Sequence, residues 1–152
     1  MKIRPTKHED ISDLKQVLDG TLLFPSEMLP DMVEGFLSGA QSDEIWLTCE
    51  DNGTAIGFCF AAPEQLTVGT WNMLAIAVLP SRQGGGVGQT IVEALEAVLR
   101  ARGHRILIVD TSGTDAFKRT REFYHKNGYT EEARIRNFWA AGDDKVVFLK
   151  AL

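Results

Sequence analysis

A run of glycines after Gln83 is the part of the chain whose residue types point most directly to chemistry. The segment Gln83-Gly84-Gly85-Gly86-Val87-Gly88 follows an apolar run and opens an amphipathic run that continues to Arg102. Glycine costs backbone entropy inside a regular element, but it lets a backbone approach a ligand closely. The first N–H groups of a helix lack internal partners and lie at the positive end of its dipole. The segment therefore predicts an anion site, such as one for phosphate.

The spacing of these glycines separates the segment from two other phosphate motifs. Gln89 and Thr90 follow Gly88, where a P-loop would continue with lysine and serine or threonine. A third glycine at the dinucleotide-binding spacing is also missing. A glycine run by itself is more often a flexible surface turn. The preceding strand, Pro80 and the following helix favour ligand binding here.

Composition narrows the class of protein. The chain has 152 residues with 44% hydrophobic and 24% charged residues, which is typical of one globular domain over residues 1–152. The net charge of −5 argues against nucleic acid as a partner and suits a cationic substrate. No apolar run reaches the ~18 residues of a membrane span. No signal peptide is recognisable, so we expect a cytoplasmic protein without a membrane partner.

The two cysteines, Cys49 and Cys59, fit a reducing compartment. A hairpin turning at Asp51-Asn52-Gly53 would place Cys49 near Ile56, so we expect no disulfide. The three scattered histidines do not form a metal site.

Periodicity and turn residues predict the elements that must position the glycine segment. We expect strands at 2–4, 45–50, 54–62, 66–79, 105–111, 129–136 and 145–150, and helices at 8–19, 26–39, 87–102 and 114–127. The apolar run from 73 to 79 predicts a strand buried on both faces. The order β-α-α-β-β-β-α-β-α-β-β predicts an α+β domain with a mixed sheet flanked by helices.

Two motifs in this order resemble the GCN5-related N-acetyltransferase (GNAT) superfamily. The family pattern is a strand, a proline and then Gln/Arg-x-x-Gly-x-Gly/Ala, which Gln83, Gly86 and Gly88 match after Pro80. The segment from Arg121 to Tyr129, Arg-Glu-Phe-Tyr-His-Lys-Asn-Gly-Tyr, is similar to the family's Arg-x-Phe-Tyr-x-x-x-Gly-Phe/Tyr segment. The resemblance covers nearly the whole chain.

The resemblance implies the fold and the cosubstrate. It implies a mixed, mostly antiparallel seven-stranded sheet that splays between its fourth and fifth strands, 71–79 and 105–111, where acetyl-coenzyme A enters. It also implies that the pantetheine arm contacts backbone at Ile76 and Val78. The pyrophosphate would lie on the amides of Gln83, Gly84, Gly85, Gly86, Val87 and Gly88.

The implied activity is transfer of an acetyl group to a primary amine by direct attack in a ternary complex. Tyr124 matches the general acid, and the N–H of Val78 is the expected donor to the thioester oxygen. Some members carry a glutamate on the fourth strand, but residues 70–74 hold no carboxylate. Asp110 is our candidate base, Glu64 a weaker one, and removal of the proton by water stays open. A binding module for coenzyme A without turnover is the alternative.

The acceptor is expected to be a small-molecule or peptide amine. The early helices, residues 20–39, and a loop between the last two strands would shape its site. Four aromatic residues are candidates for apolar walls: Phe24, Trp71, Phe138 and Trp139. Asp143 and Asp144 either hold an ammonium group or make the turn of the loop. A homodimer and transfer of a larger acyl group are also compatible with the resemblance.

Overall fold

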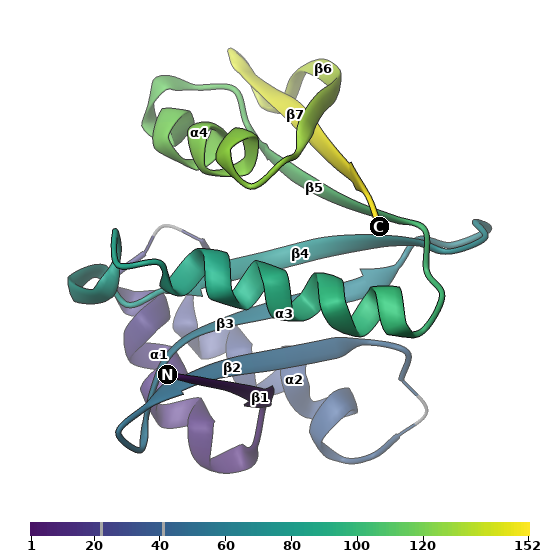
Figure 1. Cartoon of the computed structure of the whole chain (residues 1–152). Coiled ribbons are helices and arrows are strands. Elements are labelled where there is room, and N and C mark those ends of the chain that lie inside the picture. Colours follow the sequence, from purple (N-terminus) through teal and green to yellow (C-terminus); the bar gives the residue numbers. More distant parts are fainter. Residues whose placement is uncertain (22, 41) are drawn as a thin grey trace. The chain divides into compact units, whose positions relative to one another are not determined.

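The computed structural model describes residues 1–21, 23–40 and 42–152 (Figure 1). The expected range 20–39 therefore includes one residue, Leu22, that lies outside the described residues. The strands are β1 (Lys2–Pro5), β2 (Ile45–Asp51), β3 (Thr54–Pro63), β4 (Thr70–Val78), β5 (Ile106–Ser112), β6 (Thr130–Ala140) and β7 (Asp143–Ala151). The α-helices are α1 (Ile11–Asp19), α2 (Leu29–Leu37), α3 (Val87–Ala101) and α4 (Lys118–Lys126). Short 3₁₀ turns precede α1, α2 and α4, and another, Pro80–Arg82, follows β4.

The strands form one mixed sheet of seven strands in the order β1-β2-β3-β4-β5-β7-β6. The pairs β1–β2, β2–β3, β5–β7 and β6–β7 are antiparallel, whereas β4 and β5 are parallel. Three residue pairs form the parallel ladder, from Thr70 opposite Ile106 to Asn72 opposite Ile108. The predicted fold class, a mixed and mostly antiparallel seven-stranded sheet flanked by helices, is confirmed.

The chain divides into two compact units, which we describe separately. The first contains residues 1–62 and 74–98, and the second contains residues 63–73 and 99–152. In the first unit, α1 and α2 cover one face of the strands and α3 covers the other (Figure 1). The core under α1 and α2 includes Trp46, whose ring stacks on Phe58 and Phe60 with centroid distances of 5.9 and 4.3 Å.

A partly buried ion cluster joins the first strand of this unit to its neighbours. The Arg4 guanidinium donates to both oxygens of Asp10 at 2.7 and 2.8 Å and to Glu50 at 2.9 Å. The backbone N–H of Lys7 also donates to Asp10 at 2.8 Å. The Thr6 hydroxyl forms a 2.7 Å hydrogen bond with that of Thr48 on β2.

The hairpin of β2 and β3 confirms the predicted turn. Asn52 and Gly53 both have positive φ angles, 50° and 81°, as a two-residue turn of this hand requires. Cys49 pairs with Gly57 and not beside Ile56, since a bulge follows Cys49. Both cysteines are buried and free, so the expectation of no disulfide is confirmed.

Strand β4 departs from the predicted burial on both faces. Ala75 and Ala77 face the core, whereas Leu74 is 51% exposed and Ile76 and Val78 are only partly buried. The unbroken apolar run concealed this alternation, because a strand's successive side chains point to opposite faces whatever their polarity.

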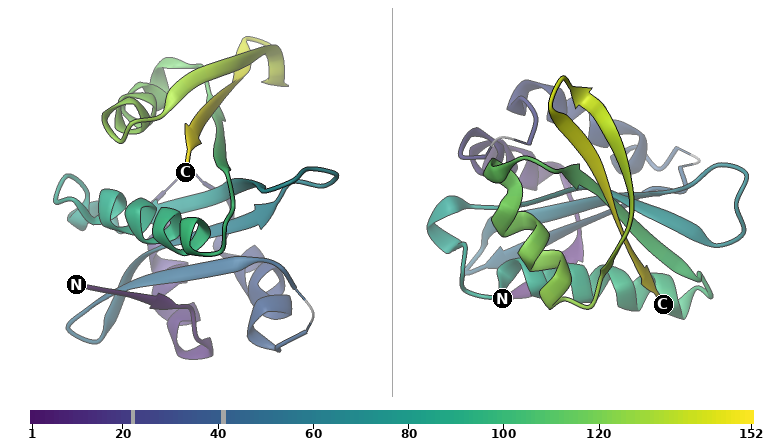
Figure 2. Two further views of the ribbon diagram at one scale, coloured as in Figure 1. Left: turned by 45° about the vertical axis from the view of Figure 1, so that its right-hand side comes forward. Right: turned by 90° about the horizontal axis from the view of Figure 1, so that it is seen from above.

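In the second unit, α4 covers one face of the sheet and β6 and β7 form a long antiparallel hairpin (Figure 2). The prediction of a loop holding Phe138, Trp139 and Asp143 is wrong: the first two lie in β6, and Asp143 begins β7. The side chains of Asn137 and Asp144 accept hydrogen bonds from backbone N–H groups where the loop was predicted. The Asn137 carboxamide oxygen accepts from Gly142 N, and Asp144 accepts from Asn137 N.

Candidate active site

The glycine segment forms an exposed turn between the 3₁₀ turn at Pro80–Arg82 and α3. Gly84 and Gly86 have φ angles of +81° and +83°, a left-handed conformation that side chains disfavour. Within the described residues, no acceptor takes the backbone N–H groups of Gly84 through Gly88. The turn therefore presents consecutive open donors at the start of a 15-residue helix, as an anion site requires.

The backbone edge of β4 leads into this turn. Leu79 N donates to Ile56 O of β3 at 2.8 Å. Because backbone groups of successive strand residues point to opposite edges, those of Val78 and Ile76 point away from β3. The Gln83 side chain donates to Val78 O at 3.1 Å and ties the turn to this edge. All eight residues expected to bind the coenzyme thus belong to the first unit.

Tyr124 lies on α4 in the second unit and is 2% exposed. Its ring meets Tyr129 edge-on at 5.7 Å and packs against Phe148 at 5.4 Å. Phe148 pairs with Val109 of β5 and so shares a face with it. Tyr124 is consequently on the opposite face of β5 from Asp110, since alternate residues change faces.

A polar cluster lies on the face of β5 that carries Asp110. Asn72, on β4, is 5% exposed. Its side-chain N–H groups donate to Glu64 Oε1 at 2.9 Å and to Asp110 Oδ2 at 3.2 Å. The Lys145 ammonium lies 3.5 Å from the same Asp110 oxygen. The two carboxylates proposed from sequence, Asp110 and Glu64, are therefore brought together, and Asn72 joins them.

Two oxygens of this cluster have no partner among the described residues. The side-chain oxygens are Asn72 Oδ1 and Asp110 Oδ1, and both are buried. The orientation of the Asn72 amide follows from its neighbours, because only its nitrogen can donate to two carboxylates. Buried acceptors without a donor are costly and rare in folded proteins, so this pair is a candidate for ligand binding.

Three residues predicted to shape the acceptor site lie near this cluster. The Lys145 ammonium is 4.6 Å from the centroid of the Phe138 ring. The indole of Trp139 meets Phe138 edge-on and donates to Thr111 O at 3.2 Å. Asp143 accepts a 2.6 Å hydrogen bond from the Ser112 hydroxyl. Phe138 and Trp139 are 48% and 49% exposed.

The other two predicted acceptor residues are elsewhere. Trp71 is buried on the strand face opposite Asn72, where its ring lies 5.1 Å from that of His104.

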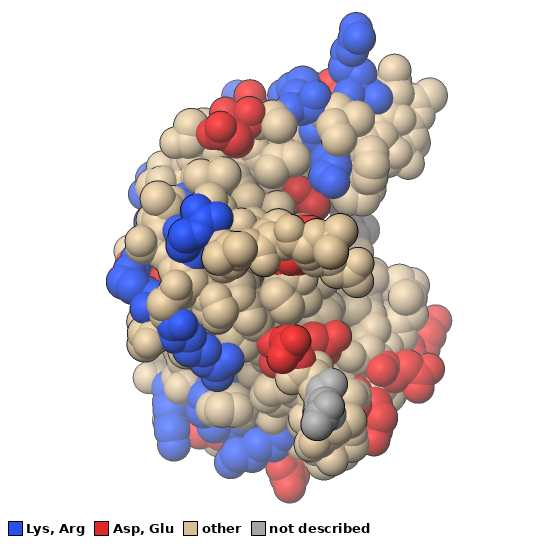
Figure 3. All heavy atoms as spheres, turned by 90° about the vertical axis from the view of Figure 1, so that its right-hand side faces the viewer, with Lys and Arg blue, Asp and Glu red and all other residues tan. Residues whose placement is uncertain are grey.

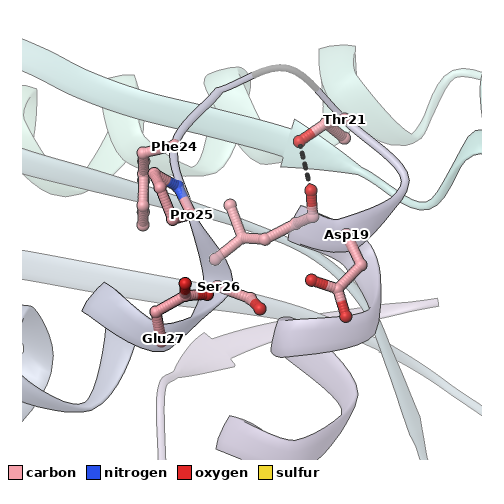
Figure 4. A pocket seen from close by; sticks show the side chains of 7 residues that line it. Asp19, Thr21, Phe24, Pro25, Ser26 and Glu27 are labelled. Atoms are coloured by element: carbon pink, nitrogen blue, oxygen red, sulfur yellow. Dashed lines mark hydrogen bonds between the residues drawn. The ribbon is translucent and has the colours of Figure 1, made fainter.

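Phe24 belongs to the first unit and lines a hollow of about 350 Å³ with Leu18, Pro25 and two acidic residues, Asp19 and Glu27 (Figure 4). The Thr21 hydroxyl donates to Leu18 O at its rim. The hollow is therefore a separate feature of the first unit.

Sequence reasoning missed Asn72, Lys145 and Arg121 as site-building residues. Arg121 donates to Ser112 O and Thr114 O at 2.8 and 2.7 Å. It thus fixes the connection from β5 to α4 and positions both elements of the site. Of these three residues, the sequence marks only Arg121, which is the first residue of the motif that contains Tyr124.

Charge is distributed unevenly over the surface. Figure 3 shows acidic and basic side chains gathered on different parts of one face. In the described ranges, no group of three or more His, Cys, Asp or Glu residues could hold a metal ion. None of the helices described is long and apolar enough to cross a membrane.

Comparison with known proteins identifies the class. The family model described as "Acetyltransferase (GNAT) domain" matches residues 42–131, more than half of the chain. The chain belongs to the GNAT acetyltransferase family. A search of curated proteins found no match.

Solved structures show the same fold. A GNAT-family protein from Desulfovibrio desulfuricans has a TM-score of 0.91 and 27% identity, covering 99% of this chain and 98% of its own. An aminoglycoside 6′-N-acetyltransferase complexed with coenzyme A has a TM-score of 0.81 and 21% identity, covering 99% and 97%. The ribosomal-protein-S18-alanine N-acetyltransferase from Escherichia coli has a TM-score of 0.78 and 18% identity, covering 99% and 92%.

Proposed function

We propose that this protein transfers the acetyl group of acetyl-coenzyme A to a primary amine. The observation that carries the proposal is the turn from Gln83 to Gly88, which offers open backbone donors where the family motif lies. A pyrophosphate fits these donors, and a pantetheine arm fits the edge of β4 at Ile76 and Val78. The coenzyme complex of the aminoglycoside acetyltransferase, a relative in fold, supports this choice of cosubstrate.

The polar cluster supplies the base. Asp110 Oδ1 is an unpartnered carboxylate oxygen, so it can accept a proton from the amine directly or through water. The chain lacks a carboxylate on β4, but Asn72 gathers carboxylates from β5 and from the segment that follows β3. The proposed base, Asp110, therefore lies on β5, beside the strand on which some family members carry a glutamate.

Tyr124 supplies the acid. The amine nitrogen bonds to the carbonyl carbon, the carbon–sulfur bond breaks, and the departing thiolate takes the phenol proton. Phenols have a pKa of ~10, close to that of a thiol, so the transfer needs little driving force. Tyr124 and Asp110 lie on opposite faces of β5, as suits a leaving group and a nucleophile on opposite sides of one carbon. The N–H of Val78 is the proposed donor to the carbonyl oxygen.

The acceptor is a small molecule or the amino group of a protein. Relatives in fold are named for both classes, an aminoglycoside and a ribosomal protein. Phe138 and Trp139 offer half-exposed rings to such an acceptor.

The test is release of coenzyme A thiol from acetyl-coenzyme A with a panel of amines and amino-terminal peptides. We expect Tyr124→Phe to lower kcat by about 10-fold or more with little change in acetyl-coenzyme A affinity. Tyr129→Phe is the matched control, because it makes the same change on a ring that contacts Tyr124. Coenzyme A binding in a thermal-shift assay without thiol release for any acceptor would identify a binding module instead.

A further inference from the structure

The exposed glycine turn depends on its neighbours for its position. Gly84, Gly85 and Gly86 are all exposed, and a carbon added at Gly84 or Gly86 would meet no atom within 4 Å. Glycine loses more conformational entropy than any other residue when its backbone is fixed, so consecutive glycines need outside support to keep one arrangement. The 3₁₀ turn Pro80–Arg82 precedes these glycines, and its contacts therefore bear directly on their position.

Pro80 rests on the end of α1. Gly20 is the C-cap of this helix, and a carbon added there would lie 2.6 Å from Cγ and 2.8 Å from Cδ of Pro80. Non-bonded carbon atoms prefer a separation of about 3.5–4.0 Å, so a larger residue fits only if Pro80 moves. The φ of Gly20 is −88°, which other residues adopt easily, so space and not backbone angle favours glycine. The helix is a firm support, because its Leu14 and Leu18 are each 1% exposed.

Arg82 ties the other end of the 3₁₀ turn to the β2–β3 hairpin. Its guanidinium donates to the Asp51 carboxylate at 2.7 Å, and Asp51 pairs with Thr54 across the hairpin. The hydrogen bond from Arg82 holds the pKa of Asp51 below its usual 3.8, so both groups are charged at neutral pH. In the sheet order β2-β3-β4, Asp51 lies beyond β3 from the edge of β4 proposed for the coenzyme. The Arg82 side chain therefore reaches away from that edge.

We infer that Gly20 and Asp51 are positioning residues for the glycine turn, acting through Pro80 and Arg82. The first contact limits movement of the 3₁₀ turn toward α1, and the second limits its movement away from the hairpin. The glycine N–H groups are then preorganised, so less conformational entropy is lost when an anion binds. All four residues belong to the first unit. That the anion belongs to coenzyme A rests on the proposed function, whereas the two contacts do not.

A steric variant tests the contact at Pro80. Gly20→Ala adds a carbon where there is no room, so Pro80 and the glycine turn should shift. We expect coenzyme A to bind about 5-fold more weakly, as measured by calorimetry on the full chain. Gly35→Ala is the matched control, because it makes the same change within α2 with no atom within 4 Å. Equal coenzyme A affinity in the two variants would contradict the inference.

A charge swap tests the contact at Arg82. Asp51→Arg and Arg82→Asp each bring like charges together, and each should weaken coenzyme A binding about 5-fold. The double variant restores the ion pair with its charges exchanged, so its affinity should return to within about two-fold of that of the natural chain. Asp31→Arg, at an exposed position of α2, controls for the change in net charge. An Arg82 that bound a phosphate directly would leave the double variant as weak as Arg82→Asp, and that result would overturn the inference.

A measurement without coenzyme separates positioning from a general loss of stability. In the ¹⁵N-labelled chain, the heteronuclear NOE of the Gly84 and Gly86 amides reports their motion on the ps–ns timescale. We expect this NOE to fall in Arg82→Asp and to recover in the double variant. Unchanged values in Arg82→Asp would contradict the inference, whatever urea unfolding shows.

Thiol release separates this inference from the proposed function. Coenzyme A affinity that follows the charge swap, without thiol release for any amine, would support the inference and remove the acetyltransfer. With turnover, the KM for acetyl-coenzyme A should rise in Arg82→Asp while kcat stays within about two-fold. Thiol release with the same KM in all of these variants would keep the acetyltransfer and overturn the inference.

Discussion

Two partly buried polar clusters of this molecule differ in how many of their polar atoms have hydrogen-bond partners. In the first unit, Asp10 accepts three hydrogen bonds, two from Arg4 and one from Lys7 N. In the second, Asn72 and Asp110 each keep an oxygen without a donor. A satisfied cluster stabilises a fold, whereas an unsatisfied one costs stability and is retained where a ligand completes it. We therefore propose a structural role for the first cluster and a functional role for the second.

Asp110→Asn is the sharpest way to break this distinction. The amide keeps the shape of the side chain but cannot act as a base, so we expect kcat/KM to fall by about 100-fold. Stability should change little, because Asp110 Oδ1 accepts no hydrogen bond from the described residues that could be lost and the ion pair with Lys145 is long, at 3.5 Å. Steady-state kinetics and urea unfolding on the same preparation measure both. A loss of stability that matches the loss of activity would assign this cluster to structure as well.

Asp10→Asn should show the opposite pattern. The Asp10 carboxylate accepts two hydrogen bonds from Arg4, and hydrogen bonds to charged groups contribute about 1.5–3 kcal/mol. Removing its charge should therefore lower the free energy of unfolding by about 2 kcal/mol. The value of kcat/KM should stay within about two-fold, because Asp10 is neither one of the expected coenzyme-binding residues nor a member of the polar cluster. Urea unfolding and the thiol-release assay are the measurements, with the exposed Asp115→Asn as control.

The same residue gives a dependence on pH. Burial would raise the pKa of Asp10, but the hydrogen bonds from Arg4 and Lys7 N outweigh it, so the pKa lies below its usual 3.8. Because the folded-state pKa is depressed, this carboxylate's contribution is complete above the unfolded pKa and is lost as pH falls through the folded value. Stability of the natural chain should fall below about pH 4 more steeply than that of Asp10→Asn. Parallel slopes in this range would contradict the role given to Asp10.

Gly86→Val tests a site made of backbone alone, in contrast to both clusters. A β-branched residue at a φ of +83° is strained by about 1–3 kcal/mol, so the turn should shift and acetyl-coenzyme A affinity should fall by about 10-fold. Gly39→Val is the matched control, with a φ of +70° beyond the end of α2 and no atom near the added carbon. It should lower stability without affecting coenzyme binding, as measured by calorimetry.

The glycine turn could be predicted from sequence, whereas the polar cluster could not. The turn is local. Its positive φ angles at Gly84 and Gly86 favour glycine, so a short stretch of sequence is enough to predict it. The cluster draws on Glu64, Asn72, Asp110 and Lys145, which only the pairing of β4, β5 and β7 brings together. Nothing in a local pattern marks Asn72 as the residue that joins two carboxylates.

The C-terminal hairpin shows a second limit of local reasoning. Gly142 and the two aspartates after it are typical of a loop, and the prediction placed Phe138 and Trp139 there. The hairpin instead continues because Asn137 and Asp144 bond to the backbone across it. Turn-forming residues predicted a turn correctly but gave the wrong length for it.

The buried cysteines of β2 and β3 have a practical consequence. Burial raises the pKa of the Cys59 thiol to about 12 and also raises that of Cys49, so neither forms a reactive thiolate at neutral pH. A thiol-reactive dye added to the folded protein should therefore report coenzyme A release without a background from the enzyme. The same dye, in denaturant and without coenzyme, would count two newly reactive thiols per chain and so follow unfolding of the first unit.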